Sequence, residues 1–383
     1  MEEARVIRLA AVGDVCAFHR EPESGWEHAG PVLAEYDTVF AQNERLYSNA
    51  TDLPDVGFTE LTRPEHVTAL RSGHLDVVSF ASNHCYDLGP EVFLETVAAL
   101  RAQGFAVIGV GKDIEEARTP AILERGGLRI GFLAYCSVLR KGYEARPGKP
   151  GAAPMRAHTL YEQTDYQPGT APRIRTFADR EDLTALLADI ASAKARTDFL
   201  AVSIHWGVHL IKGVIADYEK EVAHAAIDAG ADMIIGHGSH LLKGFEIYRG
   251  KPVFYSLGNF CFDMPLALIE AGMVRSPEFR EIIESHRVIK TPTEYDEWFS
   301  AYSMGPDQVL SVIASVELAP DASIQRVLCR PVVINSRAQP VPQTANEPGF
   351  QRVLDYLREI TADQKLPTRY TVDGDYVVIT AGG

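Results

Sequence analysis

The sequence predicts an α/β protein with a largely parallel sheet. In the first half of the chain, apolar runs of strand length alternate with stretches of helical periodicity, which is typical of βαβ units. Most of these runs are too apolar to have one face in solvent. With 383 residues, of which 46% are hydrophobic, the chain can form one large domain or one domain with an appendage.

The predicted elements follow one another in a regular order. The candidate strands are 7–12, 38–41, 76–81, 106–110, 199–204 and 232–235. The candidate helices are 62–72, 91–103, 181–195 and 217–229. The first of these helices opens with the capping-box spacing of Thr62 and Glu65 and stops at Gly73.

Short turns join three further pairs of strand-like runs, which predicts antiparallel hairpins. They are 121–124 with 129–135, 245–248 with 252–257, and 308–318 with 324–333. We interpret 139–176 as a lid-like surface loop and 263–304 as an insertion, both within a main domain over 1–337. Residues 338–383 are expected to form a helix (350–360) and a small strand pair (370–372 and 376–379) that pack on this domain.

Charge and composition narrow the function classes. The formal net charge of −15 repels polyanions, which argues against nucleic acid or an anionic membrane as the main partner. We find neither a run of apolar residues long enough for a membrane helix nor a signal peptide. Five scattered cysteines lack the spacing of a zinc ribbon or a disulfide framework. We therefore expect a cytoplasmic protein.

Side chains that bind metals follow the ends of the candidate strands. They are Asp14, Glu44, Asn83, His205, His237 and His240. Because sites in open α/β sheets form outside the carboxyl ends of the strands, we expect these groups to converge. Mixed carboxylate, amide and imidazole ligands suit manganese, iron, zinc or cobalt better than calcium. Two such divalent ions activate a shared water for in-line displacement.

His84 follows Asn83 directly and is our candidate for the general acid. It should point into the same site without binding a metal. Asp87, three residues later, is placed to hold the His84 ring and to favour its protonated form. Taken singly, these residues have ordinary explanations: Gly-Asp is common in turns, and His205 beside Trp206 would suit a core histidine.

Five local motifs carry a resemblance to a known family. They read GDV at 13–15, SNHCYD at 82–87, SIHWG at 203–207, GHGSH at 236–240 and YSLGNF at 255–260. In this order they resemble the bacterial CapA, or poly-gamma-glutamate capsule biosynthesis, family, which is similar to the calcineurin-like metallophosphoesterases. The resemblance runs from about residue 6 to about 335. It implies a layered sandwich of two sheets flanked by helices (α/β/β/α).

The resemblance also implies how two metal ions would be held. Asp14 would bind one ion, Glu44 would bridge, Asn83 and His205 would bind the other, and His237 and His240 would complete the two coordination spheres.

Three positions depart from the pattern of the wider superfamily. Cys16 stands where that superfamily has a histidine, and we keep it as an additional candidate ligand. The bridging motif reads QNE at 42–44 where relatives tend to have Asn-Leu-Glu. The histidines of GHGSH are three residues apart, whereas the usual spacing is two.

The leading hypothesis from the sequence is hydrolysis of a phosphoester or a related bond in a small or oligomeric anionic substrate. Arg45 and Lys243 are candidates for binding that substrate. A second hypothesis is cleavage of an amide or gamma-glutamyl bond, because two-metal sites also serve aminopeptidases. A third is non-catalytic binding of an anionic polymer in capsule synthesis.

Overall fold

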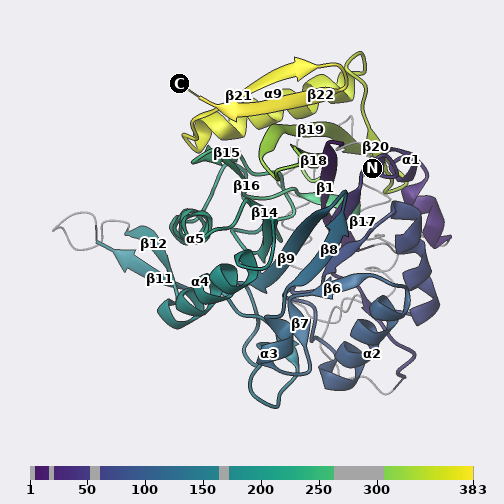
Figure 1. Ribbon diagram of the computed structural model, residues 1–383, viewed down its shortest axis with the longest axis vertical. Helices are drawn as coiled ribbons and strands as arrows, with labels where there is room; N and C mark the ends of the chain where they lie inside the picture. The colour runs from purple at the N-terminus through teal and green to yellow at the C-terminus, as the bar shows by residue number, and fades with distance from the viewer. Residues whose placement is uncertain (1–4, 17–20, 52–60, 164–171, 263–305, 383) are drawn as a thin grey trace.

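Two β-sheets packed face to face form the centre of the protein in the computed structural model (Figure 1). The structure describes residues 5–16, 21–51, 61–163, 172–262 and 306–382. The insertion predicted at 263–304 lies outside these residues. Within the described residues, no helix is long and apolar enough to cross a membrane.

The first sheet has ten strands, with the order β21-β22-β19-β18-β1-β2-β5-β6 and with β17 and β20 attached to β1 and β19. Its strands are β1 (Ile7–Cys16), β2 (Thr38–Asn43), β5 (Val77–Ser79), β6 (Ala106–Ile108), β17 (Asn259–Phe262), β18 (Leu310–Leu318), β19 (Ile324–Ile334), β20 (Pro340–Pro342), β21 (Thr368–Asp373) and β22 (Tyr376–Ala381). The run β1-β2-β5-β6 is parallel, whereas β18 pairs antiparallel with β1. The carboxyl ends of β1, β2 and β5 therefore lie at one edge.

The second sheet has six strands in the order β15-β16-β14-β13-β9-β8. They are β8 (Ala121–Arg125), β9 (Leu128–Cys136), β13 (Phe199–His205), β14 (Met233–His237), β15 (Phe245–Tyr248) and β16 (Lys251–Phe254). Strands β9, β13, β14 and β16 are parallel, and β8 and β15 close the two edges as hairpins. The three hairpins predicted from the sequence are confirmed.

Alternation along β9 shows how the layers form. Phe132 belongs to the core between the sheets, where its ring lies 6.3 Å from Phe40 of β2. The next residue, Leu133, belongs to a second core together with Leu186 and Ile190 of α4 (Arg180–Lys194). Successive side chains of a strand point to opposite faces, so β9 packs on the first sheet and on helices at once.

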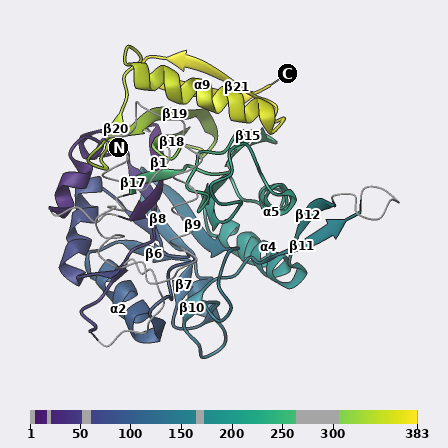
Figure 2. The ribbon, with the colours of Figure 1, turned by 180° about the vertical axis from the view of Figure 1, so that it is seen from behind.

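Helices cover the outer faces of both sheets, which gives the predicted α/β/β/α layers (Figure 2). α4 and α5 (Asp217–Asp228) lie over the second sheet, and α2 (Gly89–Ala102) packs beside the first, where Phe93 stacks on Phe80 at 5.9 Å. The shorter pieces are η1 (Pro22–Trp26), α1 (Gly30–Leu33), η2 (Pro64–Gly73), α3 (Ile114–Ala117), β3 (Leu46–Tyr47), β4 (Leu61–Thr62), β7 (Val110–Gly111) and β10 (Gly151–Ala152).

Two sequence-based expectations change in detail. The helix expected over 62–72 is the 3-10 helix η2, which begins at Pro64 with Arg63 as its N-cap residue and has no side-chain cap. Thr62 lies one residue before this N-cap position, and its hydroxyl contacts His66 Nδ1. The segment 139–176 is not wholly loop: it contains β10 and a hairpin of β11 (Ala157–Glu162) and β12 (Arg173–Ala178) that projects from the body in both views (Figures 1 and 2).

The C-terminal elements form as expected, as α9 (Pro348–Asp363) and the pair β21–β22. Strand β22 pairs with β19, so this pair extends the first sheet.

Candidate metal centre

Three oxygen donors lie at the carboxyl edge of the first sheet. Asp14 is near the end of β1, Glu44 follows β2 directly, and Asn83 lies in the turn after β5. Gly13 is needed beside Asp14, because a Cβ there would lie 2.0 Å from the carbonyl oxygen of Gly258. The parallel strand order places these donors side by side although they are far apart in the sequence.

The second sheet supplies the imidazoles. His205 is the last residue of β13 and His237 is the last residue of β14. The two residues are register partners in this parallel strand pair. His240 follows in a tight loop with a left-handed backbone (φ 54°). In this loop, the Gly238 N–H donates to Asp14 Oδ2 at 3.1 Å. Gly238 itself has φ 88°, and a Cβ there would lie 2.5 Å from His205 Nε2. Only glycine fits at this position.

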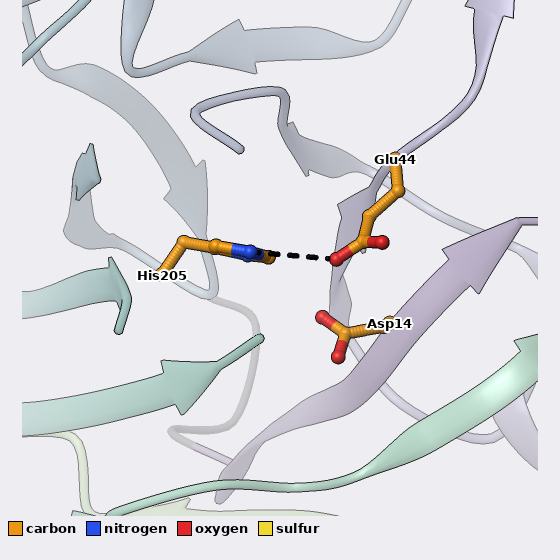
Figure 3. A group of neighbouring side chains, drawn as sticks. All are labelled: Asp14, Glu44 and His205. Atoms are coloured by element: carbon orange, nitrogen blue, oxygen red, sulfur yellow. Dashed lines mark ion pairs between the residues drawn. The ribbon is translucent and has the colours of Figure 1, made fainter. Parts of the chain in front are cut away.

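The two sets of donors meet between the sheets. Ligand atoms of Asp14, Glu44 and His205 all lie within 4.8 Å of one another (Figure 3). His205 Nε2 lies 2.9 Å from Asn83 Oδ1 and 3.5 Å from Glu44 Oε1.

The other two histidines complete the group. His240 Nε2 lies 3.8 Å from Glu44 Oε2, and its Nδ1 lies 3.4 Å from Asp14 Oδ2. His237 Nδ1 lies 3.9 Å from Asp14 Oδ1. The structure therefore brings all six residues that the sequence singled out as ligands into one group.

Burial keeps the imidazoles neutral, which is the form that binds metals. It lowers the pKa of His237 to about 3. It also lowers the pKa of His240 to about 3, with a smaller contribution from the charge of His209. The pKa of His205 is well below its usual value, first through burial and then through the charges of His237 and His240. These three side chains therefore offer lone pairs rather than positive charge at neutral pH.

His237 supplies a direct test of whether this pocket suits a cation. Its side chain is fully buried, and neither ring nitrogen has a hydrogen-bond partner among the described residues. A buried polar group without a partner costs about 1–3 kcal/mol. A metal ion bound at one ring nitrogen would give the His237 imidazole a partner. The residues present therefore fit a metal.

The predicted acid pair is formed beside this group. His84 Nδ1 lies 2.7 Å from Asp87 Oδ2, and the Asp87 side chain is fully buried. The other Asp87 oxygen accepts a hydrogen bond from the Tyr143 hydroxyl at 2.8 Å. The His84 side chain is 14% exposed, so its ring can be reached from solvent.

Three other sequence candidates are placed less favourably. Cys16 is buried and is not part of the group defined by Asp14, Glu44 and His205, and its Sγ lies 3.9 Å from Arg45 Nη1. Arg45 is fully buried as well. Lys243 is 1% exposed and donates to the Ile211 carbonyl. Neither cation is presented to a substrate that arrives from solvent, so the structure does not support their assignment to substrate binding.

Several residues that border the group were not among the ligands or the acid pair predicted from the sequence. Asn259 Oδ1 lies 2.8 Å from His240 Nδ1 and orients that ring. The ring of His209 lies 5.0 Å from the His240 ring. Asn259 belongs to the YSLGNF motif, which was a signal of its position, whereas Tyr143 lies in a segment without periodicity and left no signal.

The fold and the ligand group together define a class: a layered α/β protein with a buried group of possible metal ligands between its two sheets. A family model described as bacterial capsule synthesis protein PGA_cap matches residues 8–264, which is more than half of the chain. The chain belongs to this family, and the resemblance found in the sequence is confirmed.

Several relatives are named for capsule or polymer synthesis. The PGA biosynthesis protein CapA of Bacillus subtilis is 28% identical over 244 residues, which cover 63% of this chain and 57% of the relative. The capsule biosynthesis protein CapA of Bacillus anthracis is 25% identical, over 62% of this chain and 53% of the relative. A probable polyglutamine synthesis accessory protein of Mycobacterium tuberculosis is 32% identical, over 52% and 48%. The chain thus spans about half the length of these relatives.

Among solved structures, the calcineurin-like phosphoesterase YfkN from Bacillus subtilis aligns over 93% of this chain and 99% of its own, with a TM-score of 0.43 and 10% identity. A hypothetical protein from Thermus thermophilus aligns over 88% and 96%, with a TM-score of 0.40 and 16% identity.

Proposed function

We propose that this chain is a metal-dependent hydrolase that uses two divalent ions to cleave a phosphoester or a related bond. The observation that carries the proposal is the buried group of Asp14, Glu44 and His205, with ligand atoms within 4.8 Å of one another. The His84–Asp87 pair lies at the rim of the same pocket. A buried set of metal ligands beside a proton donor is what hydrolysis by an activated water requires.

Glu44 has the placement expected of a bridging carboxylate. Its Oε1 lies 3.5 Å from His205 Nε2, and its Oε2 lies 3.8 Å from His240 Nε2. Asn83 would join His205 on one side of this carboxylate, and Asp14 would join His240 on the other. When bound, two divalent ions such as manganese, iron, zinc or cobalt supply an activated hydroxide and stabilise the charge of the reacting group.

His84 acts as the general acid in this proposal. Its Nδ1 lies against the Asp87 carboxylate, and we assign Nε2 as the nitrogen that would carry a proton toward the substrate. Asp87 fixes the ring orientation and stabilises the imidazolium through a charge-assisted hydrogen bond. The leaving oxygen therefore receives its proton from the rim of the pocket.

We propose a small or oligomeric anionic substrate and neither nucleic acid nor a membrane surface as partner. The net charge of −15 disfavours large polyanions, whereas neutral imidazoles and bound cations favour an anion inside the pocket.

A second candidate function is cleavage of an amide or gamma-glutamyl bond. The observation in its favour is that a relative is named for PGA biosynthesis. A third is non-catalytic binding of a polymer, which the name of the accessory protein of Mycobacterium tuberculosis supports. Fold does not decide among these.

The first experiment measures metal content in protein purified without chelator. We expect about two metal ions per chain in the unmodified protein and a clear loss in Asp14→Ala. Asp113→Ala is the matched control, because Asp113 caps α3 through the Glu116 N–H and should leave the metals unchanged. Metal-free protein, or equal content in all three proteins, would refute the metal centre.

The second experiment compares phosphomonoesters, phosphodiesters and gamma-glutamyl amides as substrates with added manganese. Turnover of a phosphoester that is lost in Glu44→Gln and His84→Asn supports the leading proposal. Turnover of the gamma-glutamyl amides alone would select the second candidate. Polymer binding would be selected if no protein turns over any of these substrates while both variants keep full biological activity.

A further inference from the structure

An arginine from outside the predicted site lies next to the acid pair. Arg140 follows β9 in the segment 137–150, and its Nη1 lies 3.2 Å from Asp87 Oδ1. Tyr143 of the same segment donates to that oxygen, and the other Asp87 oxygen holds His84. One buried carboxylate therefore fixes both the His84 ring and the Arg140 guanidinium.

Arg140 is presented to solvent, unlike Arg45 and Lys243. Its side chain is 50% exposed, and its partners among the described residues are Asp87 and Tyr143. A guanidinium has five N–H donors in a planar fork, so most of them remain available to a solute.

A second cation of this segment has its donors engaged. Lys149 Nζ donates to the carbonyls of Glu144 and Pro150 at 3.1 and 3.0 Å, and it lies 4.6 Å from the centre of the Tyr86 ring. It adds positive charge near the pocket, but its hydrogen bonds hold the backbone of the segment. Arg140 is thus the cation best placed to contact a substrate.

The order of the groups gives this contact a direction. His84 follows Asn83 directly, and Asn83 Oδ1 lies 2.9 Å from His205 Nε2, so His84 lies beside the ligand group. Arg140 contacts one oxygen of the Asp87 carboxylate and the His84 ring contacts the other, so both groups lie at the same carboxylate. A substrate whose reacting group is at the ligands and whose leaving oxygen faces His84 extends toward Arg140.

We propose that Arg140 binds a second anionic group, a carboxylate or a phosphate, carried by the leaving-group part of the substrate. This inference rests on the proposed function, since it takes His84 as the acid. It makes the substrate class narrower: a phosphoester whose alcohol part also carries a carboxylate or a phosphate. A guanidinium fork matches both oxyanions with paired hydrogen bonds.

The test measures binding of phosphonates that cannot be hydrolysed, by calorimetry on the manganese-loaded protein. One series carries a terminal carboxylate on chains of increasing length, a second carries a terminal phosphonate, and a third carries the neutral carboxamide. We expect the unmodified protein to bind the best carboxylate or diphosphonate at least about tenfold more tightly than its carboxamide. Comparison of the affinities for the two charged series distinguishes a substrate that carries a carboxylate from one that carries a phosphate.

Variants then assign the preference to a residue. In Arg140→Gln the ratio of affinities for charged and neutral ligands should fall to about one, and Arg140→Lys should keep part of it. An effect of the substitution on the metals or on Asp87 changes the affinities for the charged and the neutral ligand alike. It therefore cancels in the ratio of the two affinities. Arg146→Gln is the matched control, since Arg146 is an exposed arginine of the same segment that pairs with Glu144. It should keep the full ratio.

Equal affinities of the unmodified protein for charged and neutral ligands would overturn the inference, and so would a full ratio in Arg140→Gln. Turnover of the matching phosphate esters is measured in parallel. Absence of hydrolysis with every metal counts against the proposed reaction, whereas the binding ratios alone decide the role of Arg140.

Discussion

Asp87→Asn removes the negative charge of a carboxylate that three donors share. Its Oδ2 lies 2.7 Å from His84 Nδ1, and its Oδ1 accepts from Tyr143 at 2.8 Å and pairs with Arg140 at 3.2 Å. An asparagine has one oxygen and one NH2 group, so it cannot accept at both positions. Because the side chain is fully buried, no water replaces the lost acceptor at either position.

The expected loss follows from the bond to His84. A hydrogen bond to a charged group contributes about 1.5–3 kcal/mol, and this bond stabilises the protonated ring that donates to the leaving oxygen. At about 1.36 kcal/mol per factor of ten, kcat should fall roughly ten- to 150-fold. The bound metals should be unaffected, since Asp87 is not part of the ligand group.

Two phosphate esters distinguish loss of the acid from general damage. An alkyl ester needs a proton on its leaving oxygen, whereas a nitrophenyl ester hardly does, so the loss should be confined to the alkyl ester. Asp189→Asn is the control, because Asp189 also accepts from a tyrosine (Tyr135, 2.7 Å) and an arginine (Arg118) but holds no histidine. Equal losses on both esters, or unchanged kcat, would refute the role given to Asp87.

Other predictions concern stability and metal content. Burial raises the pKa of Glu219 to about 8 in the folded protein. As pH rises, the unfolded chain loses this proton before the folded protein does. The free energy of unfolding should therefore fall between about pH 4.5 and 8, by on the order of 1 kcal/mol per pH unit. Glu219→Gln should flatten that slope in urea unfolding, and parallel slopes would contradict it. Gly238→Ala should lower stability by at least about 1–2 kcal/mol and reduce metal content, because its Cβ would meet His205; an unchanged Tm and metal content would argue against the loop geometry. Cys16→Ser should keep the full metal content by elemental analysis, and a loss would restore Cys16 as a ligand. Chelator should lower the Tm of the unmodified protein but not that of Asp14→Ala; equal shifts would show that the effect does not come from this site.

Local pattern was sufficient for most of the fold. β13 forms over Phe199–His205 where 199–204 was predicted, because a run of apolar residues bounded by turns has few other structures open to it. It was not sufficient at η2, where Thr62 and Glu65 have the spacing of a capping box but Thr62 contacts His66. Side-chain contacts at a helix start depend on neighbours that spacing does not specify.

In the candidate site as well, some residues could be predicted from the sequence and others could not. Asp14, Glu44 and Asn83 were found because each lies near or just after the end of a parallel strand of the first sheet, and such ends share an edge. Arg45 and Lys243 were chosen for their charge, but both are buried. The arginines of the irregular segment 139–176 were possible anion contacts as a group, but the sequence could not single out Arg140, because its position depends on its contacts with Asp87 and Tyr143.

The sequence alone determined the kinds of donor, their order and the strand ends from which they project, because apolar periodicity fixes which residues end a strand. Only the tertiary structure decided the distances across the pocket, since His205 and Glu44 come from different sheets and meet at 3.5 Å only when the sheets pack. It also decided which cations face solvent. Exposure is a property of the whole packed chain, whereas charge and spacing are properties of the sequence.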